Sequence, residues 1–204
     1  MVAFTLGGSP MAMYHEASRA LQDAFGSREL ADRLEARFRR PAFTEEDGAF
    51  IASLRFFFLA TADAEGRPDC SFKGGDPGFV RVLAPDLLAF PDYDGNGMFR
   101  SLGNIRANPH VGLLFIAMEE KPKRLRVSGR AEVVLDDPLI AGFEGAQALV
   151  RVTPVDIFPN CPRNIPRMQL VEESPYVPRR GVERVEPGWK GLESFADAVP
   201  PRRA

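Results

Sequence analysis

The sequence predicts a mainly β protein with some α-helix, in which short antiparallel strands close into a barrel. Between residues 56 and 158, short apolar or alternating stretches follow one another and are separated by turn residues. Few helical stretches interrupt them, whereas a parallel sheet needs a helix after nearly every strand. With 204 residues, of which 45% are apolar, the chain can build one domain with a real core.

The N-terminal part has the period of helices. Apolar residues recur at helical spacing through 11–40, and Gly26 divides this stretch into two short helices, with Ser27 as the cap of the second. Thr44 and Asp47 then have the spacing of a capping box, which predicts a third helix.

From residue 56 the period changes to that of strands. The expected strands are 56–61, 67–73, 79–83, 87–90, 111–117, 125–135 and 148–158. Helices are expected at 97–107 and 138–145, and the region beyond 170 is rich in Pro, Arg and Glu, which is typical of an irregular tail. The expected division of the chain is a helical extension at 1–43, a barrel domain at 44–170 and a tail at 171–204.

Composition excludes several classes of protein. A net charge of −2 and a pI near 5.8 argue against a general nucleic-acid binder. No apolar stretch approaches the ~20 residues that span a bilayer, and no signal peptide is visible, so we expect a cytoplasmic protein without membrane contact. Cys70 and Cys161 do not suggest a disulfide framework, and with His15 and His110 they lack the spacing of a zinc site.

The most informative stretch is 93–115, YDGNGMFRSLGNIRANPHVGLLF. A Gly-rich turn leads into a short helix that carries Arg100 and Ser101 near its start. Helix N-terminal amides, a hydroxyl and a guanidinium are the groups that hold a phosphate. The alternative is a plain turn followed by a solvated arginine, and the residues alone leave both open.

Two better-known phosphate motifs do not fit this stretch. Gly95-x-Gly97-x-x-Arg100 has an arginine where the dinucleotide fingerprint needs its third glycine, and the surrounding pattern is not βαβ. The sequence G-x-x-x-x-G-K-[ST] of a P-loop is absent.

Four segments in the same order give the chain a family resemblance. They are FFFLATADAEGRPDCSFKGG (56–75), PGFVRVL (77–83), FPDYDGNGMFRSLGNIRANPHVGLLF (90–115) and FPNCPRNI (158–165). Over roughly 45–170 the chain resembles the pyridoxamine 5'-phosphate oxidase-like FMN-binding split-barrel family. The resemblance implies a six-stranded antiparallel split barrel, a homodimer, and FMN bound at the subunit interface.

The resemblance also implies the residues of the site. The end of the second strand would touch the flavin, the segment around Arg100 would hold the phosphate, and 158–165 would approach from the partner subunit. The implied cofactor-binding residues are Cys70, Ser71, Phe72, Lys73, Asn96, Met98, Phe99, Arg100, Ser101, Asn104, Asn160 and Cys161.

The implied function is that of an FMN-dependent oxidoreductase acting on a small molecule. Lys73 would stabilise negative charge on the reduced ring, although a lysine that protects a sheet edge is an alternative role. True pyridoxamine-phosphate oxidases bind substrate through a C-terminal Arg and His, and no His follows His110 here, which favours another branch of the family. The alternatives are a non-catalytic flavin or haem carrier or regulatory binder, with His110 as an axial candidate for haem, and a deazaflavin-dependent reductase.

Overall fold

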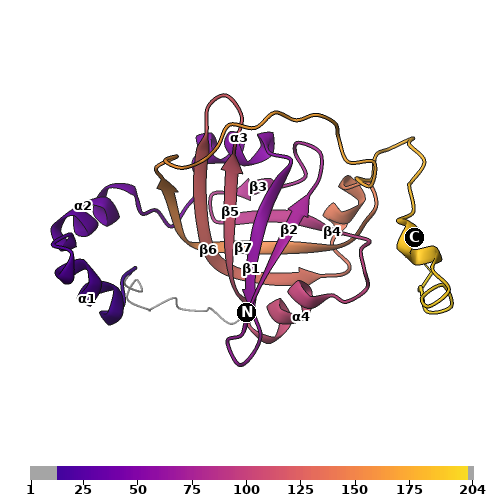
Figure 1. Ribbon diagram of the computed structural model, residues 1–204, viewed down its shortest axis with the longest axis horizontal. Coiled ribbons are helices and arrows are strands. Elements are labelled where there is room, and N and C mark those ends of the chain that lie inside the picture. Colours follow the sequence, from indigo (N-terminus) through magenta and orange to yellow (C-terminus); the bar gives the residue numbers. More distant parts are fainter. Residues whose placement is uncertain (1–12, 202–204) are drawn as a thin grey trace, which may run out of the picture. The chain divides into compact units, whose positions relative to one another are not determined.

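The computed structural model describes residues 13–201, and these fall into two compact units, Met1–Arg39 and Arg40–Ala204 (Figure 1). The first unit contains α1 (Glu16–Ala24) and α2 (Arg28–Phe38), which confirms the two helices expected there. Ser27 precedes α2 but makes no capping bond, because its backbone (φ −109°, ψ 6°) lacks the extended conformation of a cap. Its hydroxyl lies 3.5 Å from the Gln22 carbonyl instead.

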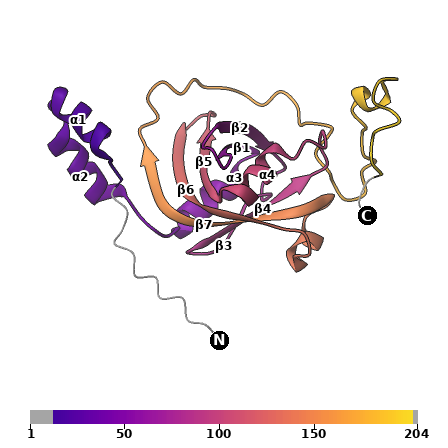
Figure 2. The same cartoon turned by 90° about the horizontal axis from the view of Figure 1, so that it is seen from below.

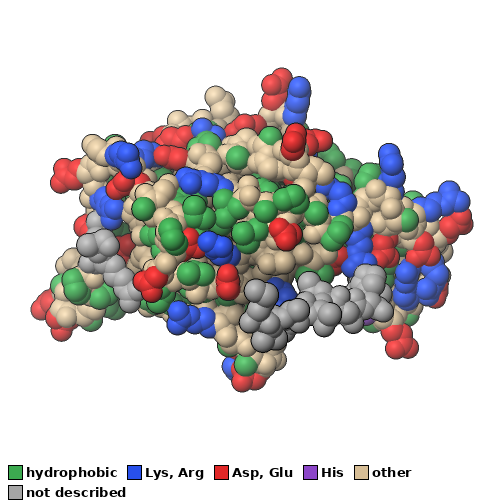
Figure 3. All heavy atoms as spheres, turned by 180° about the vertical axis from the view of Figure 1, so that it is seen from behind, with side chains coloured by type: hydrophobic (Ala, Val, Ile, Leu, Met, Phe, Trp, Pro, Cys, Tyr) green, Lys and Arg blue, Asp and Glu red, His purple; other side chains and the backbone are tan. Residues whose placement is uncertain are grey.

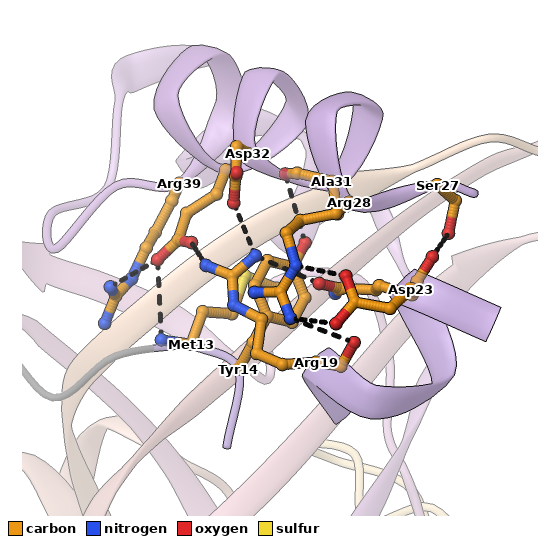
Figure 4. A network of polar contacts seen from close by, with 11 residues as sticks. Met13, Tyr14, Arg19, Asp23, Ser27, Arg28, Ala31, Asp32 and Arg39 are labelled. Carbon is orange, nitrogen blue, oxygen red and sulfur yellow. Dashed lines mark hydrogen bonds and ion pairs between the residues drawn. The ribbon is translucent and has the colours of Figure 1, made fainter. Parts of the chain in front are cut away.

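Charged side chains connect α1 and α2 (Figure 4). Arg19 of α1 pairs with Asp32 of α2, Arg28 pairs with Asp23, and the Tyr14 hydroxyl donates to the Ala31 carbonyl. Neither helix has a buried residue, so polar contacts rather than a core hold this pair together.

The second unit begins with α3 (Glu45–Ser53), which has the predicted capping box. The Asp47 amide donates to Thr44 Oγ1 at 3.1 Å, and the Thr44 amide donates to Asp47 Oδ2 at 2.9 Å. Burial alone would raise the pKa of Asp47, but hydrogen bonds from Arg40 and Thr44 hold that pKa below its ordinary value. The start of α3 is therefore fixed by a paired, ionised carboxylate.

Seven strands form one antiparallel sheet in the order β2-β1-β5-β6-β7-β4-β3. Their bounds are β1 Phe56–Ala62, β2 Pro68–Gly74, β3 Arg81–Ala84, β4 Leu87–Tyr93, β5 His110–Ala117, β6 Lys123–Val134 and β7 Ala146–Asn160. Each expected strand is present, so the sheet has one strand more than the barrel that the resemblance implies. Figure 2 shows the sheet curling, but in the described part of the chain its end strands β2 and β3 do not pair, so it is an open sheet.

The core lies inside this curve and centres on Phe57, which is fully buried. Its ring centroid lies 4.9 Å from that of Phe90 and 5.2 Å from that of Phe115. Helices α3 and α4 (Arg100–Ala107) lie at opposite ends of the curved sheet (Figure 1), and Ile51 and Ile105 bury against the core from these ends.

Two further elements complete the unit. A helix was expected at 138–145, and the structure has a shorter 3₁₀ helix, η1 (Pro138–Gly142), which Asp137 caps through the Leu139 amide at 2.9 Å. The C-terminal region follows β7. Among its described residues, 161–201, the one element of regular structure is the 3₁₀ turn η2 (Gly188–Gly191). Seen from behind, apolar side chains occupy much of the middle of the surface and charged ones surround them (Figure 3).

Gly129 gives a test of the β6–β7 packing. It lies where the register of this pair shifts, and an added Cβ would press on the Thr153 carbonyl and lie 3.2 Å from Pro154 Cα. We expect Gly129→Ala to lower the free energy of unfolding by about 1–3 kcal/mol, measured by urea denaturation. Gly112→Ala is the control, because its Cβ would meet Ala60 at an ordinary 3.7 Å. Equal stability of the two variants would contradict this packing.

Candidate functional site

The pairing of β2 with β1 places three polar side chains on the inner face of the sheet. Lys73 lies opposite Phe57 in the register, and Ser71 lies opposite Leu59, so both share the face that carries the core. Asp69 follows on the same face by the alternation of the strand. All three are partly buried, whereas Cys70 and Phe72 are exposed on the other face.

A buried acid from β4 stands beside Lys73. Asp92 is 9% exposed, and its Oδ1 lies 3.9 Å from Lys73 Nζ. Gln147 Nε2 donates to Asp92 Oδ2 at 2.9 Å. Burial raises the pKa of Asp92, and the nearby Asp94 acts in the same direction, while Gln147 and Lys73 oppose the shift. The site therefore contains an acid that holds its proton more readily than usual.

The turn before α4 has an unusual backbone. Gly97 and Phe99 both have positive φ, 72° and 48°, and a left-handed residue with a side chain is typical of turns under constraint. No side chain caps α4, and its first turn carries no acidic residue. Since the first amides of a helix have no partner within the helix, this turn offers N–H donors to an anion.

Asp69 occupies a position next to the two polar side chains at the start of α4. Its Oδ1 lies 3.5 Å from Arg100 Nη2, and its Oδ2 accepts from Ser101 Oγ at 3.4 Å. The Arg100 side chain is 64% exposed, so it can turn toward a further anion without leaving buried space. A bound anion would thus share Arg100 with Asp69.

These groups meet in one cavity of about 640 Å³, within the range that holds small ligands and cofactors. The sequence-predicted residues that line it are Cys70, Ser71, Lys73, Asn96, Met98, Phe99, Arg100 and Ser101. Sequence reasoning did not single out Asp69, Asp92, Gln147, Trp189 and Lys190, which also line it.

Two of the predicted residues, Phe72 and Asn104, belong to the elements that line the cavity but do not line it themselves. Phe72 stacks on Phe56 on the outer face of the sheet, with ring centroids 5.3 Å apart. Asn104 donates from Nδ2 to Thr61 Oγ1 at 3.0 Å, which ties α4 to β1. Asn104 thus fixes the position of the helix whose first turn lines the cavity.

Asn160 and Cys161 lie away from this cavity, at the end of β7. Cys161 lines a second cavity, and its carbonyl accepts from Arg124 Nη2 at 2.9 Å. Asn160 Oδ1 and Arg124 Nε are buried without a hydrogen-bond partner among the described residues. Within one chain, the 158–165 segment and the residues around Arg100 therefore line two different cavities.

Across residues 13–201, no group of three or more His, Cys, Asp and Glu side chains is arranged to hold a metal ion. None of the helices in this range is long and apolar enough to cross a membrane. His110 is exposed at the start of β5 beside Arg130 and does not line the first cavity.

Comparison with protein families identifies the class. Residues 43–187 match the family described as pyridoxamine 5'-phosphate oxidase, and the chain belongs to this family. The match includes every strand of the sheet, α4 and most of the residues that line the cavity. It ends before η2.

Solved structures with related folds have low sequence identity. HupZ from Group A Streptococcus is 17% identical with a TM-score of 0.48, over 62% of this chain and 99% of that one. HutZ, the heme storage protein from Vibrio cholerae, is 22% identical with a TM-score of 0.39, over 52% and 84%. An FMN-binding protein from Syntrophomonas wolfei is 12% identical with a TM-score of 0.38, over 72% and 96%. No curated protein matches the sequence.

The buried acid makes stability depend on pH. At neutral pH the Asp92 carboxylate is charged in the unfolded chain, and its burial opposes ionisation in the folded protein. We therefore expect Asp92→Asn to raise the free energy of unfolding at pH 7. The gain should shrink as the pH falls through the raised pKa and vanish below the ordinary value of 3.8, where both states are protonated.

Urea denaturation across this pH range measures the effect. Asp86→Asn is the matched control, because Asp86 is exposed, and we expect no gain from it at any pH. A gain for Asp92→Asn that stays constant with pH would contradict a buried acid.

Proposed function

We propose that the first cavity binds FMN and that the protein is a flavin-dependent oxidoreductase acting on a small molecule. One observation carries the proposal. The uncapped first turn of α4, with Arg100 and Ser101, opens into the same cavity as Lys73, in a chain of the pyridoxamine 5'-phosphate oxidase family. An anion site and an inward-facing cation in one cavity suit a ligand with a phosphate at one end and, at the other, a ring that takes up negative charge on reduction.

The lining of the cavity fits both parts of FMN. Its phosphate would take the α4 amides, the Ser101 hydroxyl and the Arg100 guanidinium. Exposed apolar side chains offer a surface for a flat ring, since Met98 is 64% exposed and Phe99 is 52% exposed. Large apolar side chains left open to water in a cavity favour a ligand that covers them.

The remaining polar groups would orient the ring and set its electrostatics. Bound FMN would supply the hydride or electron transfer. Lys73, held 3.9 Å from Asp92, would place a positive charge near the ring and favour its anionic reduced form. Asp92 keeps Lys73 in place, and Gln147 in turn orients Asp92.

A homodimer would complete this site. Phe56, Phe58 and Phe72 form an aromatic cluster on the outer face of β1 and β2, and Phe72 is 61% exposed. Such a cluster is typical of a surface that a partner covers. The partner would also supply Asn160 and Cys161, which lie outside the cavity of their own chain.

The curved sheet supports a split barrel. The free cysteines support a reducing, cytoplasmic setting.

A haem carrier draws less support from the cavity. Haem needs an axial ligand, but His110 lies outside the cavity, and the Cys70 side chain is on the outer face of β2. The cavity itself does not separate FMN from a deazaflavin, because the phosphate and ring contacts would be shared. The absorption spectrum of the reconstituted protein distinguishes flavin, deazaflavin and haem.

Arg100 tests the phosphate contact. We expect Arg100→Ala to weaken FMN binding about 10- to 100-fold, because a hydrogen bond to a charged group contributes roughly 1.5–3 kcal/mol. Fluorescence titration with FMN measures the dissociation constant. Arg106→Ala is the control, because it removes an exposed arginine at the other end of the same helix. Equal affinities of the two variants would place the phosphate elsewhere.

Phe72 tests the dimer. We expect Phe72→Glu to produce a monomer in analytical ultracentrifugation. The dimer would bury the aromatic cluster, and a charge placed there opposes association. FMN affinity should fall with the dimer, since the partner's contribution to the site is lost. Phe25→Glu is the control, because Phe25, which directly follows α1, is 82% exposed. A wild-type monomer that binds FMN would contradict the shared site.

A further inference from the structure

The C-terminal region packs on the sheet domain, although its composition predicts an irregular tail. Five ion pairs join it to that domain. They are Glu173 with Arg55 (2.7 Å), Arg179 with Asp76 (2.6 Å), Arg180 with Glu144 (4.0 Å), Arg184 with Glu144 (3.5 Å) and Lys190 with Asp94 (2.5 Å). The pairs are spaced along residues 173–190, so this stretch is held to the domain along its length. Its last part, from residue 188 on, lies beyond the family match.

Gly145 shows how closely this region approaches. Its φ is 73°, and an added Cβ would lie 2.6 Å from Pro178 Cβ and 2.9 Å from Arg184 Nη2. No side chain fits between the turn before β7 and the C-terminal region. A glycine with positive φ at a close approach is typical of built packing.

Lys190 joins this region to the rim of the cavity. Its side chain is only 11% exposed, and Nζ lies between Asp94 at 2.5 Å and Glu186 at 3.6 Å. A lysine is rarely this buried unless it is paired. Asp94 directly follows β4, so this contact places the next residues of the region beside Asp92 and the turn before α4.

Two aromatic side chains from the region then line the cavity. Trp189 and Phe195 pack edge to face, with ring centroids 6.2 Å apart. They remain 38% and 48% exposed, so each keeps a large apolar surface open. The apolar surface of the cavity thus comes from two parts of the chain. Met98 and Phe99 precede α4, and Trp189 and Phe195 lie near the C-terminus.

We propose that Trp189 is a ligand-binding residue of the cavity, which Lys190 positions, and that it selects a planar aromatic ligand. This inference rests on the proposed function, because FMN is the planar ligand in question. An indole held by a buried ion pair loses little freedom on binding, so its contact with a ring is gained at low entropic cost. Removal of either the indole or the ion pair would let the ligand leave faster.

The dissociation rate of FMN tests the contact. After dilution of the FMN complex, recovery of flavin fluorescence gives the rate. Trp189→Leu should dissociate about tenfold faster, because an aromatic pair contributes roughly 0.5–1.5 kcal/mol beyond its buried area. Trp189→Phe should stay within about threefold of wild type, because it keeps a ring. Tyr176→Leu is the control, since Tyr176 is an exposed aromatic of the same region outside this cavity.

The role of Lys190 needs a measurement without FMN. Trp189 is the only tryptophan of the chain, so intrinsic fluorescence reports on it alone. Lys190→Met should shift its emission to the red and speed FMN release, whereas Arg180→Met should do neither, because the Arg180 side chain is 90% exposed.

The outcomes separate the two proposals. Wild type that binds FMN, with an unchanged release rate for Trp189→Leu, would overturn the role of Trp189 and leave the proposed function standing. Unchanged emission for Lys190→Met would overturn the positioning role. Wild type that binds no FMN would overturn the proposed function, and this inference with it. Circular dichroism of each variant checks that it has folded.

Discussion

The register between β1 and β2 is the constraint on which the site depends. Phe57 is the centre of the core, and it lies directly opposite Lys73. A slip by one residue would turn Phe72 inward and Lys73 outward, because side chains alternate along a strand. The same register that fills the core with Phe57 and Leu59 therefore places Lys73, Ser71 and Asp69 along the cavity. Packing of the core thus decides which side chains of β2 reach the cavity.

The second constraint is the turn before α4. Phe99 holds a left-handed conformation that a side chain disfavours, and α4 begins without a cap. Such costs persist where the surrounding contacts fix the backbone, here through Asn104 on Thr61 and through Ile105 in the core. The result is a helix start with open amides beside Arg100. Open amides beside a guanidinium are what an anion site requires.

Much of the fold could be predicted from the sequence, because periodicity reflects burial. The seven strands and the capping box at Thr44 are visible in apolar spacing and in local hydrogen-bonding residues. The position of α4 and the Arg100–Ser101 pair could also be found, since the Gly-rich turn marks it. Asp92 could not, because it extends an apolar strand and only the pairing of β4 with β7 brings it to Gln147. Trp189 and Lys190 belong to a region without periodicity, whose path is set by long-range ion pairs and by close packing at Gly145.

The central claim is that one cavity holds the phosphate at α4 and the ring between Lys73 and Trp189. A crystal structure of the protein grown with FMN tests it most directly. The account predicts density for the phosphate within hydrogen-bonding distance of the first amides of α4 and of Arg100, with the ring beside Lys73. Density for FMN in another place, or an empty cavity in protein saturated with FMN, would contradict it.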